Sequence, residues 1–382
     1  MSRHARLFVS LWTVSILVGP LALQARASDI LDIRGFGGWA AGKTNNDNIY
    51  PDSPVPVAAK ELQLDNVYFT LNLLAKPAEW ISIHAQPTWQ SSMRGREVQL
   101  DLAYVELTVV KDLRFRAGKI RNPLGLYTDI YKVGTLRPFY LLPNSYYRLV
   151  PESYAGLGLN RVQHLGSWEL EVDLLGGQMD FPASDVDTVV GFDETTNSYI
   201  FGSVPVAATG KDVIGGGFLL RTPIEGLKIA ASAYTMRLWG SVAGAPLEKL
   251  SDDRQKAYAG AIEYVTDKIS LRSEALFTRG YEKDDAAYVE AAYKITPHFQ
   301  LAGTFEYLHL KEPASPVETL DKHRALGAAL NYWASSNVVF KLDYYHVKYN
   351  RAARPADAVN RALAGTLPET TDVVIGGVQF AF

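Results

Sequence analysis

The sequence predicts an all-β protein: a transmembrane antiparallel β-barrel of about 16 strands, with short periplasmic turns and long extracellular loops. Three features indicate this fold. The chain begins with a segment typical of exported proteins, apolar and polar residues alternate along most of the remainder, and the last residue is the aromatic Phe382. No later window approaches the roughly 18 uninterrupted apolar residues of a spanning helix.

The first residues have the layout of a cleavable secretory signal peptide. A short basic stretch precedes an apolar run over 7–23, and a small-residue cleavage site follows at 25–27. The apolar run is too short and too interrupted to be kept as a spanning helix. We therefore expect a signal peptide over 1–27 and an outer-membrane barrel over 28–382, in the outer membrane of a Gram-negative cell.

Composition excludes several classes of function. The chain has 0 cysteines, so it has neither a disulfide framework nor a thiolate for metal binding or catalysis. Its net charge of -3 becomes more negative once the leader, which contains arginines but no acids, is removed. A mildly acidic chain does not indicate nucleic-acid binding. The mean hydropathy is near zero, as expected where lipid-facing and lumen-facing residues alternate.

Period-2 alternation recurs in each predicted strand. Over 168–174, for example, Trp168, Leu170 and Val172 fall on one face. Acidic residues occupy the positions between them. The same split recurs over 65–74, 269–277 and 340–344. In a membrane barrel the apolar face contacts lipid and the polar face lines the lumen.

The connections between these segments fall into two classes, short and long. Short turns are expected at 75–79, 111–112, 165–167, 222–226, 266–268, 295–297 and 334–337. Long connections are expected at 40–64, 87–97, 119–153, 177–212, 238–254, 279–285, 309–322 and 348–369. This asymmetry is typical of bacterial barrels with both termini on the periplasmic side. A barrel of this size is wide enough for an aqueous channel.

The last strand ends in a pattern typical of exported barrels. Its apolar face carries Phe380 and closes on Phe382. We interpret these two residues as the signal that the barrel assembly machinery recognises.

Motifs for catalysis or cofactor binding have little support. Residues 37–44 formally match the P-loop pattern, but the polar, proline-containing segment that follows does not predict the required helix. The histidines are scattered, and neither an HExxH nor a GxSxG motif is present. We expect no cofactor, no metal and no enzymatic activity, although a barrel-anchored enzyme or adhesin remains an alternative.

A basic region stands out between residues 113 and 152. Alternation places Arg114 and Arg116 on the inner face of one strand, and further basic residues follow in the third external connection. Tyrosines interleave with them, and these either pack the loop against the wall or form a track for sugars or aromatic acids.

The chain resembles the trimeric porins in strand number, loop order and terminal phenylalanine. Residues 116–126 are also similar to the stretch that follows a mid-barrel strand in phosphate-selective porins. In trimeric porins the third loop folds into the barrel and narrows the pore. The resemblance implies that 119–153 does the same here, and that the chain forms a homotrimer.

On this basis the basic residues form a cationic patch where the pore is narrowest, and rings of basic side chains select anions. The candidate constriction and anion-binding residues are Arg114, Arg116, Lys119, Arg121, Arg137 and Arg148. Alternatively, they anchor the loop to inward-facing acids or bind lipopolysaccharide phosphates. The opposite wall is predicted to present the acids Glu263, Glu274, Glu290, Glu306 and Asp343. Such a wall would produce a transverse field that orients dipolar solutes.

The expected function is passive diffusion of small hydrophilic solutes across the outer membrane, with an anion preference if the basic patch lines the constriction. A solute-specific channel for phosphate or a carboxylate is the alternative within transport. Expected partners are outer-membrane lipid and lipopolysaccharide, small solutes or anions, the barrel assembly machinery and further copies of the chain.

Overall fold

The computed structural model describes residues 30–52, 56–92, 95–181, 184–193, 198–242, 245–312, 315, 317–355 and 357–382. The predicted signal peptide, 1–27, lies outside these residues. No helix in the described part has the length and apolar character needed to cross a bilayer.

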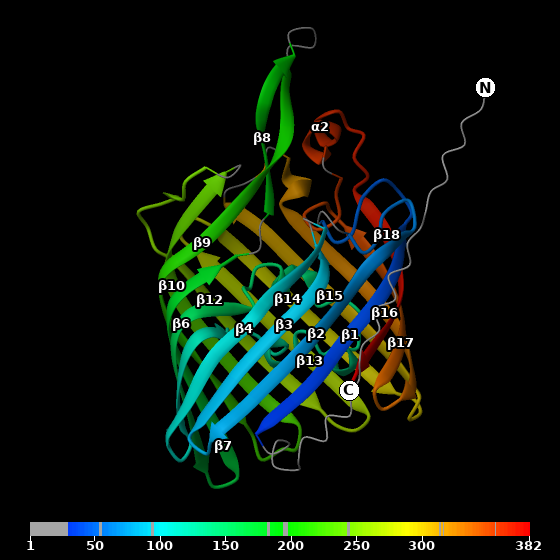
Figure 1. The fold of residues 1–382 in the computed structure, drawn as a ribbon. Coiled ribbons are helices and arrows are strands. Elements are labelled where there is room, and N and C mark those ends of the chain that lie inside the picture. Colours follow the sequence, from blue (N-terminus) through cyan, green and yellow to red (C-terminus); the bar gives the residue numbers. More distant parts are fainter. Residues whose placement is uncertain are drawn as a thin grey trace, which may run out of the picture.

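The described strands form one closed antiparallel sheet, drawn in Figure 1. It contains 18 strands, of which β8 and β11 lie outside the barrel wall and leave 16 within it. The ring closes because β1 pairs with both β2 and β18. The wall strands are β1 (Leu31–Thr44), β2 (Gln63–Ala78), β3 (Ile81–Ser92), β4 (Gly95–Val110), β5 (Leu113–Arg121), β6 (Ser153–Leu165), β7 (Trp168–Asp180), β9 (Ser198–Arg221), β10 (Leu227–Val242), β12 (Gln255–Val265), β13 (Ile269–Arg279), β14 (Lys283–Lys294), β15 (Phe299–Glu312), β16 (Lys322–Ser335), β17 (Val338–Lys348) and β18 (Thr370–Ala381).

The remaining elements belong to the connections. Strand β8 (Ser184–Asp193) pairs with the first part of β9, and this hairpin projects beyond the barrel in Figure 1. Strand β11 (Glu248–Lys249) is a short addition to β10. The helical turns are η1 (Thr128–Ile130), η2 (Gly134–Leu136), α1 (Asn144–Tyr147), η3 (Glu318–Leu320) and α2 (Ala358–Leu363).

The predicted alternation is confirmed in the wall. On β13, the lipid-facing Leu271 and Phe277 are 45% and 44% exposed, whereas the lumen-facing Glu274 is 1% exposed. Residues 37–44, which match the P-loop pattern, lie within β1. The described residues that follow, 45–52 and 56–62, contain no helix, so the P-loop pattern lacks its structural context there.

The short turns are found where the sequence predicts them, but three of the predicted long connections differ. Strands β3 and β4 continue their pairing through 87–92 and 95–97, so this connection is short. Much of 177–212 is strand, and only 280–282 separate β13 from β14. Polar residues led to these loop predictions. Backbone pairing nevertheless continues above the membrane, where both faces of a strand can be solvated and the apolar alternation is no longer needed.

The C-terminal aromatics lie over glycines of the first strand. Gly37 is opposite Phe380 in the β1–β18 ladder. A Cβ atom at Gly35 would lie 2.1 Å from the Phe382 ring, and one at Gly37 would lie 2.4 Å from the Phe380 ring. The two glycines therefore make room for the aromatic rings where the barrel closes.

Candidate functional site

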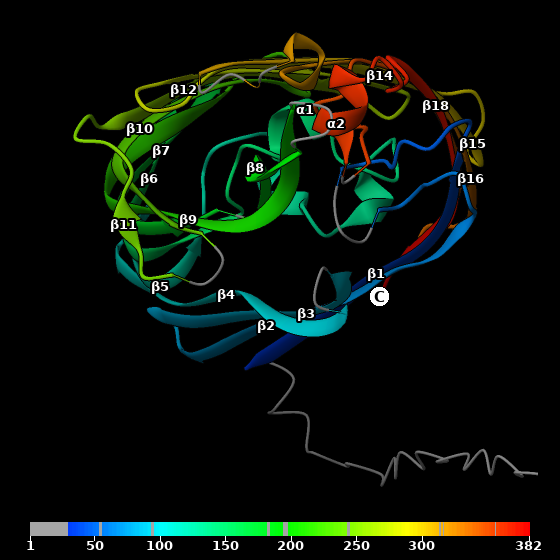
Figure 2. The same cartoon turned by 90° about the horizontal axis from the view of Figure 1, so that it is seen from above.

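The connection between β5 and β6, residues 122–152, lies inside the barrel, and we call it the inner loop. Figure 2 shows it within the ring of strands. It reaches wall strands that lie across the ring from each other. Lys132 Nζ lies 3.4 Å from the side-chain oxygen of Gln90 on β3, and the Leu126 N–H donates to Glu274 on β13 at 2.8 Å. The inner loop therefore spans the lumen, as the resemblance to trimeric porins implied.

Local sequence shapes the loop at its base and its first turn. The backbone and side-chain amides of Asn122 donate to the carbonyls of Glu152 and Pro151, each at 3.0 Å, which joins the two ends. Gly125 has φ +109°, and a Cβ atom there would lie 2.9 Å from the Tyr147 hydroxyl oxygen. Only glycine fits this position without strain.

Wall carboxylates hold the inner loop in place. Glu274 accepts hydrogen bonds from the Leu126 N–H and from the Tyr147 hydroxyl. On β15, Glu306 accepts one from the Ser145 N–H at 2.8 Å. On β17, Asp343 accepts one from the Tyr140 N–H at 2.7 Å, and on β14 Glu290 accepts one from the Tyr127 hydroxyl. Buried carboxylates and loop amides both require partners, so each satisfies the other.

The predicted acidic wall is therefore not open to the pore. Glu274, Glu290, Glu306 and Asp343 face inward as predicted, but the inner loop covers them and leaves each at most 2% exposed. They anchor the loop and do not face a basic patch across open water. Alternation located these residues, but it carries no information about what covers them.

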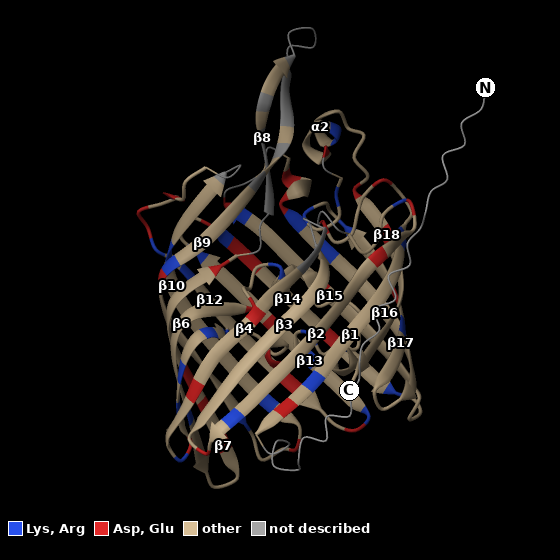
Figure 3. Ribbon diagram, viewed as in Figure 1, with Lys and Arg blue, Asp and Glu red and all other residues tan. Residues whose placement is uncertain are grey.

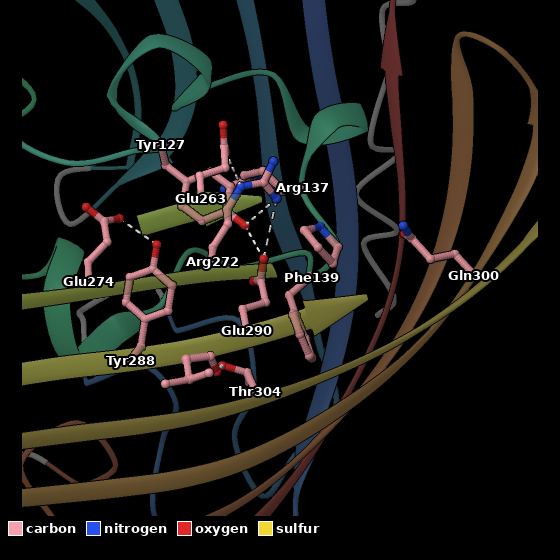
Figure 4. A network of polar contacts seen from close by, with 12 residues as sticks. Tyr127, Arg137, Phe139, Glu263, Arg272, Glu274, Tyr288, Glu290, Gln300 and Thr304 are labelled. Carbon is pink, nitrogen blue, oxygen red and sulfur yellow. Dashed lines mark hydrogen bonds and ion pairs between the residues drawn. The ribbon is translucent and has the colours of Figure 1, made fainter. Parts of the chain in front are cut away.

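A second network lies beside the first turn of the inner loop, shown in Figure 4. Arg272 lies 2.7 Å from Glu263 and 3.6 Å from Glu290. Its guanidinium also donates to the Tyr127 hydroxyl at 3.3 Å and lies 5.0 Å from the centre of that ring. The fifth predicted acid, Glu263, is thus bound to Arg272 and, at 2.7 Å, to Lys228. A buried charge is tolerated when it is paired in this way.

The structure separates the predicted basic residues. On β5, Arg116 lies 2.7 Å from Glu106 and 3.3 Å from Asp173, and Arg114 lies 3.9 Å from Glu106. Both face the lumen, as predicted. Lys119 is on the outer face, because it has the same alternation parity as the outward-facing Phe115 and Ala117. Its placement in the pore was wrong.

Arg137 and Arg148 both lie in the inner loop, and Arg148 ties this loop to the external loops. Arg137 is 8% exposed within the inner loop. Arg148 lies 3.2 Å from Asp52 of the first external loop, and Arg354 of the last external loop lies 2.9 Å from the same carboxylate. Burial raises the pKa of Asp52, but the two arginines oppose this effect and hold the pKa below its ordinary value. The carboxylate therefore ties three loops together.

Two cavities lie beside the inner loop. The first, which we call the His84 cavity, has a volume of about 200 Å³ and is lined by Asn72, His84, Ala85, Gln86, Leu102, Tyr104, Arg121 and Asp129. The second, the Gly217 cavity, lies between the loop segment 121–129 and strands β5, β7, β9, β10, β12 and β13. Arg121 and Asp129 line both cavities, so the two spaces meet at these side chains.

Several solved structures share this fold. OmpF of Salmonella typhi in complex with daunomycin is 14% identical, with a TM-score of 0.58 over 92% of this chain and 97% of that chain. An anion-selective porin from Comamonas acidovorans is 10% identical, with a TM-score of 0.56 over 92% and 99%. The trimer form of OmpT from Vibrio cholerae is 11% identical, with a TM-score of 0.53 over 92% and 99%. These likenesses concern the fold.

Sequence comparison adds a match to a family model. Residues 242–382 match the family described as phosphate-selective porin O and P. The match covers the C-terminal part of the barrel wall, from the end of β10 to β18. No curated protein matches it in sequence.

Small side chains keep the Gly217 cavity of the barrel open. Gly217 on β9, Ala230 and Ser232 on β10, and Ala259 and Ala261 on β12 line the wall that faces the inner loop. Larger residues at these lumen-facing positions would fill the space. Alternation predicts which face these residues occupy, but their small size was not recognised as a sign of a passage.

The charged lining of the barrel is mixed, and Figure 3 shows basic and acidic residues interspersed on the same strands. Sequence reasoning missed Arg221 and Lys228, which line the Gly217 cavity. Arg221 lies 2.5 Å from Glu169 and 3.1 Å from Glu171. These residues flank a short turn on the inner face of their strands, so parity alone could have located them.

Arg121 and Asp129 differ from the lining residues that form ion pairs, such as Arg116 and Arg221. Arg121 donates to the side-chain oxygen of Gln86 at 3.0 Å and to the backbone carbonyl of Thr128, both neutral groups. Asp129 is exposed on η1. Within the part of the chain that the structure describes, neither residue has an ion-pair partner. Nor do any three His, Asp or Glu side chains of that part come close enough to hold a metal ion.

Proposed function

We propose that this protein is an outer-membrane porin, a passive diffusion channel for small hydrophilic solutes with an anion preference set at Arg121. The observation that carries the proposal is the inner loop, which spans the lumen and leaves cavities on both sides of Arg121 and Asp129. The narrowed lumen would exclude large solutes, and the charge of Arg121 would favour anions among the small ones. The process needs no covalent chemistry and no energy source.

The basic residues around the two cavities differ in whether a nearby carboxylate compensates their charge. Arg116, Arg221 and Lys228 each have a carboxylate within 3.3 Å, so their fields are largely cancelled. Arg121 is bound to neutral oxygens, and no ion pair offsets its charge at the junction, the place where the two cavities share Arg121 and Asp129. A low-dielectric wall focuses such a field on passing ions.

The test is single-channel conductance in a planar bilayer, with the reversal potential measured under a KCl gradient. We expect large current steps with anion preference, and loss of that preference in an Arg114, Arg116 and Arg121 triple alanine variant. The matched control is Lys119→Ala, which removes a basic residue from the outer face. Equal selectivity in the triple variant and the wild type would refute the charge argument. No conductance from a correctly folded barrel would refute the channel.

A channel specific for phosphate or a carboxylate is the second candidate, and the family match over 242–382 favours it. A specific channel saturates, because the solute occupies a site while it crosses. Current that is blocked by micromolar to millimolar phosphate, but not by equal ionic strength of chloride, would support this candidate. Unsaturated transport of both anions would leave the general channel.

We also propose that the mature porin, released by cleavage after residue 27, assembles as a homotrimer. Contacts with outer-membrane lipid and lipopolysaccharide are part of this proposal, as is insertion by the barrel assembly machinery. The trimer form of Vibrio cholerae OmpT, which shares the fold, supports the oligomeric state. Light scattering of the native protein in detergent tests it, and a monomer mass after mild extraction would contradict it.

A further inference from the structure

The His84 cavity contains several polar side chains with spare hydrogen-bonding capacity. Within the described part of the chain, the side chains of Asn72 and Asp129 and the hydroxyl of Tyr104 have no hydrogen-bond partner, although all three line the cavity. His84 contacts Ser82 Oγ at 3.0 Å through one ring nitrogen. Groups of this kind on one cavity wall are available to a solute.

The same cavity holds a cation, Arg121, that is fixed in position and forms no ion pair in the described part of the chain. Gln86 donates to Asp101 at 3.3 Å and accepts from Arg121 at 3.0 Å, so it holds the guanidinium in place. A guanidinium with free N–H groups binds a carboxylate through charge-assisted hydrogen bonds. The solute that best fits therefore carries a negative group.

The other side chains that line the His84 cavity indicate which groups the solute carries besides its negative group. Amide, imidazole and phenol groups bind hydroxyls, and Asp129 is an acceptor for hydroxyl protons. Asp129 also opposes a small multivalent anion such as phosphate, because like charges in one cavity repel. The rings of His84 and Tyr104 are stacked with their centres 4.4 Å apart, and they add a rigid aromatic side to the cavity. A volume of about 200 Å³ is below the roughly 300 Å³ of drug-sized pockets and suits a single small ring.

We propose that the His84 cavity is a binding subsite for hydroxylated carboxylates of monosaccharide size, such as sugar acids. The carboxylate would bind Arg121, and the hydroxyls would bind Asn72, Tyr104 and Asp129. This inference rests on the proposed channel function, and it names the solute class that would pause at the junction.

The experiment measures block of single-channel current by glucuronate, glucose, phosphate and alanine, each added to the same KCl solution. Glucuronate should block saturably and more strongly than the other three, because only it combines a carboxylate with several hydroxyls. Arg121→Gln should weaken glucuronate block by about tenfold, the effect expected when a charge-assisted hydrogen bond is lost. Lys119→Gln, on the outer face, is the matched control and should leave the block unchanged.

Asp129→Asn distinguishes sugar acids from zwitterions. Asparagine keeps an acceptor for hydroxyls, so glucuronate block should stay within a few fold of the wild type. If alanine blocks more strongly and Asp129→Asn abolishes that block, the site binds amino acids and the proposal is wrong. Equal block by phosphate and glucuronate would mean a plain anion site, which also overturns it. Current without any glucuronate block overturns the subsite and leaves the channel, whereas absence of current overturns the channel itself.

Discussion

Arg272 holds three partners beneath the inner loop, and all three contacts depend on its guanidinium. Its neighbours Glu263 and Glu290 are buried carboxylates, and Tyr127 carries the loop above them. Removing one member of a buried ion network leaves uncompensated charge, which costs about 3–5 kcal/mol. We predict that Arg272→Leu lowers the free energy of unfolding in urea by an amount in this range, measured by tryptophan fluorescence.

The control for Arg272 is Arg34→Leu. Arg34 lies 2.9 Å from Asp32, but both side chains are well exposed, and exposed ion pairs contribute little to stability. We expect no measurable change in unfolding for this variant. Equal effects of the two substitutions would show that burial of the Arg272 network contributes nothing.

The inner loop is the element whose position should set the width of the passage. Glu274 receives the Leu126 N–H and the hydroxyls of Tyr147 and Tyr288. In Glu274→Gln, one of the two acceptor oxygens becomes an NH₂ donor, so not all three donors can be satisfied. We predict larger and noisier single-channel currents and a higher size limit for uncharged polyethylene glycols. Glu312→Gln, which alters an exposed acid at the end of β15, serves as the control.

Acid should loosen the contact between the external loops. The pKa of Asp52 is held below its ordinary value of 3.8 by Arg148 and Arg354, against the effect of burial. A carboxyl whose pKa is lowered on folding stabilises the fold at neutral pH. This contribution is lost as the pH falls through the lowered pKa. We predict faster backbone hydrogen exchange in the last external loop at pH 3 than at pH 7, after correction for intrinsic rates.

Asp52→Asn removes the titrating group and should exchange rapidly at both pH values. An Asp52→Asn protein that still showed the full pH difference would assign the effect to another carboxyl. An unchanged wild-type loop at pH 3 would show that the Asp52 ion pairs do not limit loop opening.

How far the sequence could predict each element depends on whether the signal is local. Alternation is local, and it located the strands and the inward faces of Arg114, Glu274 and Asp343. The contacts of the inner loop are not local, because Tyr140 and its partner Asp343 are 203 residues apart. Only the porin resemblance implied that the loop turns inward. No pattern could show that it would cover the acids.

The same limit applies to the junction of the cavities. Arg121 was among the predicted site residues because it follows a basic strand. Asp129 was not among the predicted site residues. Asp129 matters for the lining of the cavities because it has no ion-pair partner within the described chain. Pairing is a property of the folded lumen, and composition cannot reveal it.

At the scale of the whole molecule, the barrel closes where β1 meets β18. Phe382 contacts β1 at this closure, and it is also the predicted assembly signal. Its backbone N–H and carbonyl exchange hydrogen bonds with Gly35, each at 2.9 Å, and its ring lies over the same glycine. These backbone hydrogen bonds do not depend on the ring, and Phe382 as a whole is 62% exposed. The ring should therefore contribute less to the stability of the finished barrel than to recognition during insertion.

We predict that Phe382→Ala strongly lowers the amount of porin in the outer membrane but only slightly lowers the unfolding temperature of protein refolded in detergent. Heat-dependent migration on gels measures both, in membranes and after refolding. Phe299→Ala, another exposed aromatic on the lipid face, is the control and should preserve membrane yield. Because one substitution is compared in two folding environments, the experiment separates the two roles. A large loss of thermal stability in detergent would make Phe382 a structural residue of the closure. Normal membrane yield would end its assignment as an assembly signal.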